Sequence, residues 1–401
     1  MTNRPETSIH TTTHDPMQRH LHIVPSYAPS GDGVMRLAWF GPMDLELGGH
    51  LPDVTVAYRT WGKLNDAGDN AVIVLHALTG DSRAADDGGW WEPVIGPGSP
   101  IDTDQSFVMC ANVLGGCQGS TGPASHDPSG RPWGTRFPLI TIGDIVNVQR
   151  RLVDQLGIKK LVAIGGSIGG LQALEWATRH AELVRGAGVI AASGALSALG
   201  IAIHGEIGRR AIMADPNWRD GDYVEHRVFP EQGLAIARMA AMTTYHSRES
   251  LGSRFGRNPA SRPTLYPSFG PTFDVEGYLH YHGRALAQRF DANSYLYLTR
   301  AMDLYDVGRD GGDDYWFDQI TAPLLLVGIS SDWLFPSEDI CLLADRIRDR
   351  GKDVTFCEIE SPNGHDAFLK DWNELNPIID HFMDYVGAPD TLTPLTDGAS
   401  G

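Results

Sequence analysis

A short stretch between residues 160 and 176 constrains the fold of this chain more than any other. An apolar run, Leu161 to Ile164, leads directly into Gly165-Gly166-Ser167-Ile168-Gly169-Gly170, and helix-forming residues follow at once. The motif G-x-S-x-G between a strand and a helix is typical of a sharp turn that raises a serine above the end of a sheet. Glycine is favoured on both sides because so tight a turn leaves no room for Cβ atoms. The pattern predicts that Ser167 is a nucleophile at the positive end of a helix, although glycine-rich turns of this kind also occur as structural turns and phosphate sites.

The composition limits the kinds of partner that the protein can have. The 401 residues are 42% hydrophobic and carry a formal net charge of -18, which disfavours nucleic acid and anionic membrane surfaces. We expect no membrane span and no secretory signal, since the chain has no apolar segment near the required length of about 18 residues. The cysteines lack C-x-x-C spacing, so we predict no metal site and reduced thiols in a cytoplasmic protein. They are Cys110, Cys117, Cys341 and Cys357.

Strand and helix patterns alternate before and after Ser167. Residues 70–78 and 106–114 are apolar runs of the kind that is buried on both faces of a parallel sheet, and each ends in a glycine-containing loop. A helical stripe at 144–156 and a further buried strand at 184–192 continue the alternation. This order predicts an α/β fold with a mostly parallel sheet and helices on both faces. Two antiparallel strands, 34–41 and 51–61, are expected to precede it.

Residues 194–313 differ from the rest because they contain helical patterns and no buried strand. We interpret them as a helical lid inserted into one α/β core made of residues 32–193 and 314–387, with disordered tails at 1–31 and 388–401. Within the lid we expect a loop at 247–271 and helices at 199–214, 232–245, 275–291 and 294–303. After it we expect strands at 323–331 and 354–359, a helix from Ser337 as N-cap to Arg350, and a final helix at 367–385.

Three residues with complementary chemistry each follow a predicted buried strand. They are Ser167, Asp332 and His365, and their order along the chain is that of an α/β-hydrolase triad. A serine hydroxyl needs an imidazole to accept its proton, and the imidazole needs a carboxylate to hold its tautomer. His365 is the predicted base and Asp332 its partner, the alternative for Asp332 being a helix cap. Asp313 and Asp314 are weaker candidates, because they precede a strand.

Two backbone N–H groups are the expected oxyanion hole. In this fold one comes from the residue after the serine, here Ile168, and the other from an earlier loop at a strand end, for which Leu78 is the best candidate. His76, in the same loop as Leu78, is interpreted as a structural residue.

With these residues in place, the chain resembles the homoserine O-acetyltransferase family of α/β-hydrolase-fold acyltransferases over residues 34–387. Ile168 departs from the Met of many relatives, which a backbone donor should tolerate. The segments that carry the resemblance are His76-Ala-Leu-Thr-Gly80, Gly89-Trp-Trp91, Ile95-Gly-Pro-Gly98, Pro100-Ile-Asp-Thr-Asp104, Asn112-Val-Leu-Gly-Gly-Cys-Gln-Gly-Ser-Thr-Gly-Pro123, Ala211-Ile-Met-Ala-Asp-Pro-Asn-Trp218, Ser331-Asp-Trp-Leu-Phe-Pro336 and Gly364-His-Asp-Ala-Phe368.

The resemblance implies a ping-pong reaction of methionine biosynthesis with no cofactor besides the co-substrate acetyl-CoA. Acetyl-CoA would acylate Ser167, and L-homoserine would then take the acetyl group. The resemblance also implies a homodimer formed through the lid helices. It assigns Arg238 to the substrate carboxylate and Asp366 to the ammonium, which suits the chemistry of both side chains. The alternatives are a solvated helix charge for Arg238 and a helix-start residue for Asp366.

Other functions remain open at this level. The same triad could hydrolyse an ester or thioester, and a non-catalytic relative is disfavoured because all three triad residues are present. Within the family, succinyl-CoA could replace acetyl-CoA and L-serine could replace homoserine. The loop Gly115-Gly116-Cys117-Gln118-Gly119 resembles the acetyl-using branch.

Overall fold

The computed structural model describes residues 31–260, 270–309 and 311–387, so the predicted tails lie outside the described residues apart from Gly31. Within these residues the main sheet has nine strands. Its order is β1 (Gly31–Asp32), β5 (Val54–Gly62), β9 (Phe107–Ala111), β6 (Ala71–Leu75), β10 (Leu161–Gly166), β11 (Val184–Ile190), β12 (Leu324–Ile329) and β13 (Val354–Ile359), while β2 (Arg36–Phe40) also pairs with β5.

The sheet is parallel from β9 to β13, as predicted, and β1, β2 and β5 are antiparallel additions at one side. Parallel strands end at the same edge of a sheet. The loops that follow β6, β9, β10, β12 and β13 therefore gather at one edge. Leu78, Ser167, Asp332 and His365 all belong to these loops.

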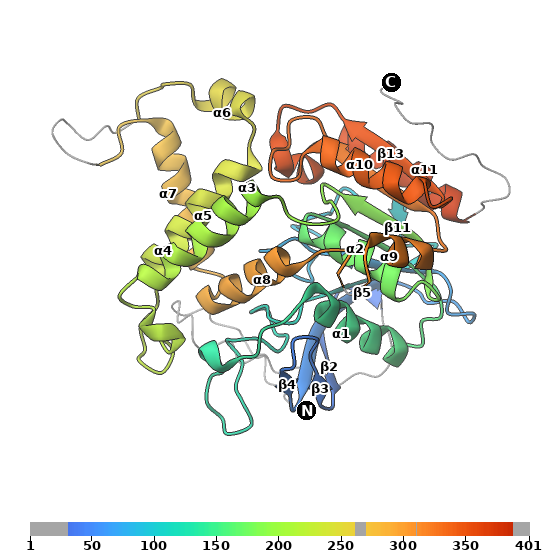
Figure 1. Ribbon diagram of the computed structural model, residues 1–401, viewed down its shortest axis with the longest axis horizontal. Helices are drawn as coiled ribbons and strands as arrows, with labels where there is room; N and C mark the ends of the chain where they lie inside the picture. The colour runs from blue at the N-terminus through green and yellow to red at the C-terminus, as the bar shows by residue number, and fades with distance from the viewer. Residues whose placement is uncertain (1–30, 261–269, 310, 388–401) are drawn as a thin grey trace, which may run out of the picture.

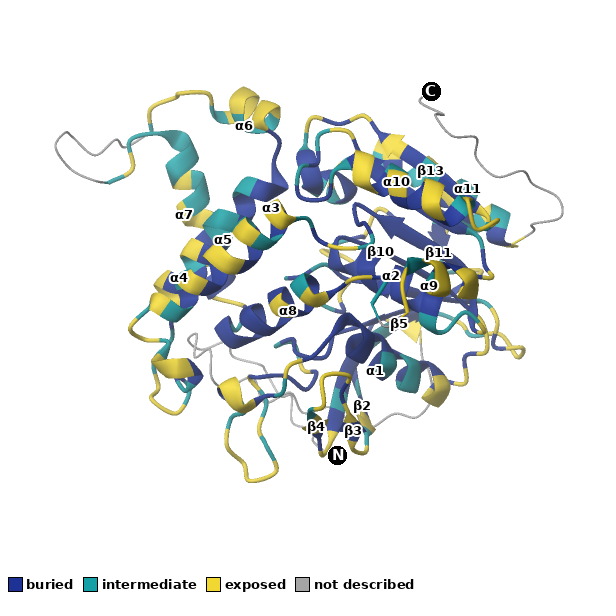
Figure 2. Cartoon of the chain, viewed as in Figure 1, coloured by how far each residue is buried: buried dark blue, intermediate teal, exposed yellow. Residues whose placement is uncertain are grey.

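Alternation along β10 explains why its sequence is apolar throughout. Leu161 and Ala163 pack into one core with α1 (Ile142–Gln155), α2 (Ile168–Arg179) and α10 (Ser337–Arg348). Val162 and Ile164 point to the other face and pack with α11 (Trp372–Gly387). Helices thus cover both faces, and the strands are buried between them (Figure 2). The α/β-hydrolase-type sheet predicted from the sequence is confirmed.

The described residues between β11 and β12 form helices with no named strand among them, and we call residues 194–313 the helical insertion. In Figure 1, α4, α5 and α7 lie together to one side of the sheet. Its elements, with α9 at the return to the sheet, are α3 (Ala198–Gly200), η2 (Ile201–Ile207), α4 (Gly208–Ala214), η3 (Arg219–Gly221), α5 (Glu231–Tyr245), α6 (Arg248–Phe255), α7 (Asp274–Ala287), α8 (Ala292–Leu304) and α9 (Asp313–Gln319).

The expected helix 199–214 is helical throughout, with the π-helical turn η2 as its middle part. Three local predictions need correction. The expected loop 247–271 contains α6, whose N-cap Ser247 accepts a hydrogen bond from Ser250 N. Ser337 is the first residue of α10 and not its N-cap, because its hydroxyl donates to Glu358 and Pro336 takes the cap position. The last helix, α11, begins at Trp372, since residues 364–369 form the 3-10 turn η4.

Short elements complete the described chain. They are the strand pairs β3 (Met43–Asp44) with β4 (His50–Leu51) and β7 (Ile95–Gly96) with β8 (Ile101–Asp102), and the 3-10 turn η1 (Gly134–Arg136).

Candidate active site

The turn that carries Ser167 has the strained geometry of a nucleophile elbow. Ser167 has φ 60° and ψ -129°, outside the regions that L-residues favour, and its N–H donates to Ile190 O at 3.0 Å. The flanking glycines are needed for close packing. A Cβ on Gly166 would lie 2.5 Å from the Phe368 ring, and a Cβ on Gly169 would lie 2.0 Å from Leu75 O. The sequence pattern is thus explained by contacts on both sides of the serine.

Asp332 and His365 form a buried hydrogen-bonded pair at the ends of β12 and β13. His365 Nδ1 lies 2.6 Å from Asp332 Oδ2, and both side chains are almost fully buried. The other oxygen, Asp332 Oδ1, accepts hydrogen bonds from the N–H groups of Leu334 (2.9 Å) and Phe335 (3.1 Å). Asp332 therefore orders its own turn with one oxygen and is free to orient the imidazole with the other.

The imidazole of His365 has the electronic state that a general base requires. With Nδ1–H donating to Asp332, Nε2 is left as the acceptor, and it has no hydrogen-bond partner among the described residues. Burial lowers the pKa of His365, but the charge of Asp332 and the hydrogen bond to it outweigh burial, so the pKa is raised overall. A raised pKa makes the imidazole a stronger proton acceptor.

Rings pack around the imidazole of His365. The rings of Tyr245 and Phe335 have centroids 5.8 and 5.7 Å from it, and Phe368 lies edge-on at 5.6 Å. Phe368 is also the ring against which Gly166 packs. Phe368 therefore packs against both the Ser167 turn and His365, although no hydrogen bond joins Ser167 to His365 in this structure.

The two expected oxyanion donors are available. Ile168 N–H is the first of α2, and Leu78 N–H follows the end of β6; neither donates a hydrogen bond within the described part of the chain. His76 braces the Leu78 loop, because Nδ1–H donates to Ala77 O (2.8 Å) and Nε2 accepts from Val113 N–H (3.2 Å). Burial lowers the pKa of His76, so the imidazole that makes these two contacts is neutral. The structural interpretation of His76 fits these contacts.

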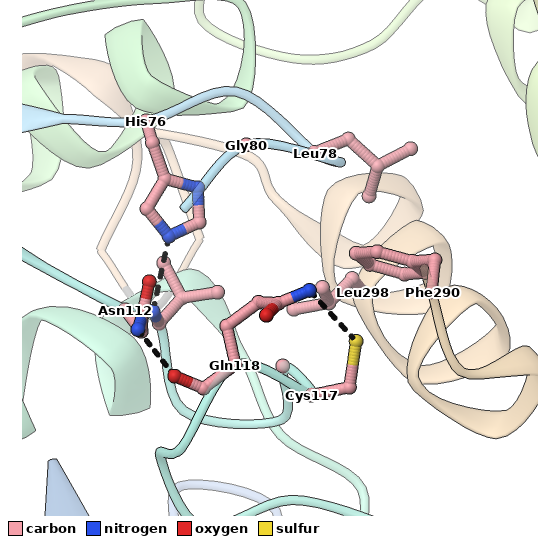
Figure 3. Close-up of a pocket in the computed structure, with 10 residues that line it drawn as sticks. His76, Leu78, Gly80, Asn112, Cys117, Gln118, Phe290 and Leu298 are labelled. Carbon is pink, nitrogen blue, oxygen red and sulfur yellow. Dashed lines mark hydrogen bonds between the residues drawn. The ribbon is translucent and has the colours of Figure 1, made fainter. Parts of the chain in front are cut away.

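A small pocket adjoins the Leu78 loop (Figure 3). Leu78 lines one side and Cys117 and Gln118 the other, while Phe290 and Leu298 reach it from the helical insertion. Burial raises the pKa of the Cys117 thiol to about 12, so the thiol is protonated at neutral pH. The remaining residues that line the pocket are His76, Gly80, Asn112, Val113 and Gly116.

Arg289 joins the insertion to both glycine-containing loops and was not identified from the sequence. Its Nη1 donates to Thr79 O at 2.8 Å, and its own carbonyl accepts from Gln118 Nε2 at 3.0 Å. These contacts cross more than 170 residues of chain, so no local pattern could reveal them.

Arg238 and Asp366 both lie near Tyr245. The guanidinium carbon of half-buried Arg238 is 5.1 Å from the Tyr245 ring centroid, and Asp366 directly follows His365. Asp366 Oδ2 also forms an ion pair with Lys370 Nζ at 3.0 Å, which the sequence analysis did not anticipate. The structure thus brings a cation and a carboxylate from different elements near Tyr245, the ring that stacks on His365.

The weaker acid candidates lie elsewhere. Asp313 and Asp314 begin α9, before β12, where they form ion pairs with Arg346 and Arg350. Neither is the partner of His365. Among the described residues no group of His, Cys, Asp and Glu is arranged to hold a metal ion, and no described helix is long and apolar enough to cross a bilayer.

Known proteins share this sequence and architecture. Residues 70–371 match the alpha/beta hydrolase fold family. A homoserine O-acetyltransferase from Carboxydothermus hydrogenoformans is 46% identical over 359 residues, which cover 86% of this chain and 94% of that protein. The crystal structure of homoserine O-acetyltransferase from Bacillus anthracis has a TM-score of 0.82 at 26% identity and covers 88% of this chain and 98% of its own.

An esterase has a similar structure. Esterase E22 has a TM-score of 0.81 at 27% identity, with 87% of this chain and 99% of the esterase covered. The backbone architecture therefore does not separate transferases from esterases, but the much higher identity to the relative from Carboxydothermus hydrogenoformans does assign the family. By its sequence, its sheet and the arrangement of Ser167, Asp332 and His365, the chain belongs to the homoserine O-acetyltransferase family of α/β-hydrolase-fold proteins.

Proposed function

We propose that this protein transfers the acetyl group of acetyl-CoA to the side-chain hydroxyl of L-homoserine, giving O-acetyl-L-homoserine and CoA for methionine biosynthesis. The observation that carries the proposal is the 46% identity to a homoserine O-acetyltransferase over 86% of the chain. The buried Asp332–His365 pair at the sheet edge of the strained Ser167 turn supports it.

The first half-reaction acylates Ser167. His365 Nε2 accepts the hydroxyl proton as the serine oxygen attacks the thioester carbonyl. The resulting oxyanion is stabilised by the N–H groups of Leu78 and Ile168, both free of other partners within the described chain. The C–S bond then breaks, the proton on His365 passes to the sulfur, and CoA leaves while the acetyl group remains on Ser167.

The second half-reaction moves the acetyl group to the acceptor. His365 removes the proton of the homoserine side-chain hydroxyl, the oxygen attacks the acetyl ester, and Ser167 regains its proton from the imidazole. The acceptor must outcompete water at about 55 M, which requires that its hydroxyl be held in line. We assign this holding to Arg238 on the carboxylate and Asp366 on the ammonium.

Hydrolysis is the alternative function, and the likeness to an esterase is the observation that favours it. It needs the same acyl-serine and differs only in the molecule that attacks it. Succinyl-CoA as donor and L-serine as acceptor are the alternatives within the family.

A thiol-release assay that crosses acetyl-CoA and succinyl-CoA with homoserine, serine and water separates these functions. We expect rapid CoA release with acetyl-CoA and homoserine together, and slow release when either is replaced. CoA release from acetyl-CoA that is equally fast without an amino acid would establish a hydrolase instead.

We further propose a cytoplasmic homodimer formed through the helical insertion. Three large apolar side chains on this insertion are about half exposed, namely Leu199, Ile207 and Ile236, and a partner surface would cover them. None of the four cysteines forms a disulfide, which suits a reducing compartment. Sedimentation of the Ile207→Asp/Ile236→Asp double variant should reveal a monomer if this surface forms the dimer.

A further inference from the structure

A buried histidine with no role in the reaction lies behind the active site. His204 is 2% exposed and belongs to the π-helical turn η2 of the helical insertion. Such turns are rare and are found frequently at functional sites. Here the turn interrupts what the sequence predicts as one continuous helix, so its presence points to a constraint at His204.

His204 forms a hydrogen bond with Tyr245. Its Nε2 lies 2.7 Å from the Tyr245 hydroxyl. Burial lowers the pKa of His204 to about 3, assisted by the charges of His365, Arg238 and Arg209. Burial also raises the pKa of Tyr245 to about 12, against the charge of Arg238 and its hydrogen bond to the phenol. Both partners are therefore neutral, and the bond holds the phenol without adding charge.

Tyr245 lies between the proposed base, His365, and the proposed acceptor-binding residue, Arg238. Its ring lies nearly parallel to the imidazole of His365, with 5.8 Å between centroids and 27° between planes. The guanidinium carbon of Arg238 is 5.1 Å from the centroid of the same ring. A change in the position of the Tyr245 hydroxyl would therefore change the position of Arg238, while the ring itself stays beside His365.

Of the two buried tyrosines beside His204, only Tyr245 forms a hydrogen bond with it. Tyr295 lies on the other side of His204, with 6.4 Å between ring centroids, and is fully buried. Its hydroxyl has no hydrogen-bond partner among the described residues. The imidazole thus bonds one of its two tyrosine neighbours, and that one contacts the active site.

We infer that His204 is a positioning residue, which fixes the Tyr245 hydroxyl and through it the orientation of the Arg238 guanidinium that receives the acceptor carboxylate. This inference rests on the proposed function. Without the imidazole, the buried phenol loses this partner and can turn. The Arg238 guanidinium, which hydrogen-bonds the same phenol, would then move with it and lose its alignment with the substrate carboxylate.

The test measures the homoserine KM and the single-turnover release of CoA from acetyl-CoA for three variants, His204→Leu, Tyr245→Phe and their combination. Each single variant should raise the homoserine KM about 3- to 10-fold, the effect of one neutral hydrogen bond. CoA release should stay within about twofold of wild type, because the ring next to His365 is retained. The combined variant should be no worse than the worse single variant, since both remove the same bond.

Two further variants separate positioning from packing. His204→Gln can offer an amide near the place of Nε2 and should keep the homoserine KM close to that of the wild type. Tyr295→Phe removes the hydroxyl of the other tyrosine beside His204 and serves as the matched control, with unchanged kinetics expected. If His204→Leu does not fold, Tyr245→Phe and His204→Gln still decide the question, because only the first should raise the KM.

Additive KM effects in the combined variant, or an unchanged KM in Tyr245→Phe, would overturn the inference. So would a loss of CoA release equal to the loss of transfer, since His204 would then serve the triad. A failure of the proposed function is distinguishable, because wild-type protein would then not transfer acetyl groups to homoserine at all.

Discussion

The sheet edge and the helical insertion build the site in different ways. At the sheet edge, Ser167 is fixed by a strained backbone between packed glycines, and Asp332 uses both carboxylate oxygens to fix its turn and His365. The insertion supplies half-buried Arg238, and Phe290 and Leu298 at the pocket. From this difference we propose that the core makes the acyl-serine and that the insertion helps to select what attacks it.

Removal of the nucleophile should have the largest effect. We expect Ser167→Ala to lower turnover on the order of 10⁶-fold, because no group can then carry the acetyl. Ala tolerates the same backbone and leaves no cavity, so the thermal unfolding temperature should be nearly unchanged. Turnover and a thermal melt check this. Activity near that of wild type would mean that the strained turn is only structural.

Loss of the carboxylate charge tests the core next. Asp332→Asn should keep the turn but present the wrong imidazole tautomer, which lowers turnover about 10⁴-fold in another triad enzyme. Asp313→Asn and Asp314→Asn are matched controls at the other edge of the sheet, and their turnover should stay near that of wild type. A large loss in either control with little loss in Asp332→Asn would reassign the acid.

Changes to the acceptor-binding pair should act mainly on homoserine. Arg238→Ala and Asp366→Ala should each raise the homoserine KM about 10- to 100-fold, because each removes a hydrogen bond to a charged group. Arg284→Ala, an exposed arginine on α7 of the same insertion, is the control and should have little effect. Steady-state kinetics in homoserine check this, and an unchanged KM in both variants would place the amino-acid pocket elsewhere.

The pH dependence reports on the base. The pKa of His365 is raised above its ordinary value near 6.5, since the charge and hydrogen bond of Asp332 outweigh burial. Only the neutral imidazole can accept the serine proton, so acylation should be constant above the raised pKa and fall about tenfold per pH unit below it. Asp332→Asn should move this break to lower pH. A wild-type rate that stays constant well below about pH 6 would contradict the raised pKa.

The ion pair of Asp366 with Lys370 predicts the smallest effect. Lys370 places an ammonium on the carboxylate that we assign to the ammonium of homoserine. Lys370→Met should therefore lower the homoserine KM, by no more than about fivefold because exposed ion pairs are weak. Lys159→Met, an exposed lysine ahead of β10, is the control. A raised KM would mean that Lys370 orients Asp366 instead of competing for it.

Much of the α/β core could be predicted because short stretches of sequence determine where its strands begin and end. Apolar runs mark the parallel strands, and parallel strands deliver their following loops to one edge, which is why the positions of Ser167, Asp332 and His365 followed from the sequence. The identity of the acid also followed, since Asp313 and Asp314 come before their strand. The catalytic roles themselves remain predictions until they are measured.

The insertion was harder to predict because its structure depends on distant contacts. Tyr245 reads as an ordinary helical residue, and only tertiary packing brings it between His204 and His365. Likewise, nothing local to Arg289 indicates that it bonds Thr79 across the chain. The helix α6 was missed because its glycine and serine content favours a loop, although Ser247 supplies a suitable N-cap.

The division of labour between core and insertion is tested most directly by a double-mixing experiment on Arg238→Ala. Protein is first mixed with acetyl-CoA, the burst of CoA is recorded, and homoserine is then added to discharge the acyl-enzyme. We predict a burst with wild-type rate and amplitude, followed by transfer at least about tenfold slower at subsaturating homoserine. A burst lost as completely as in Ser167→Ala, with homoserine saturation unchanged, would contradict the division.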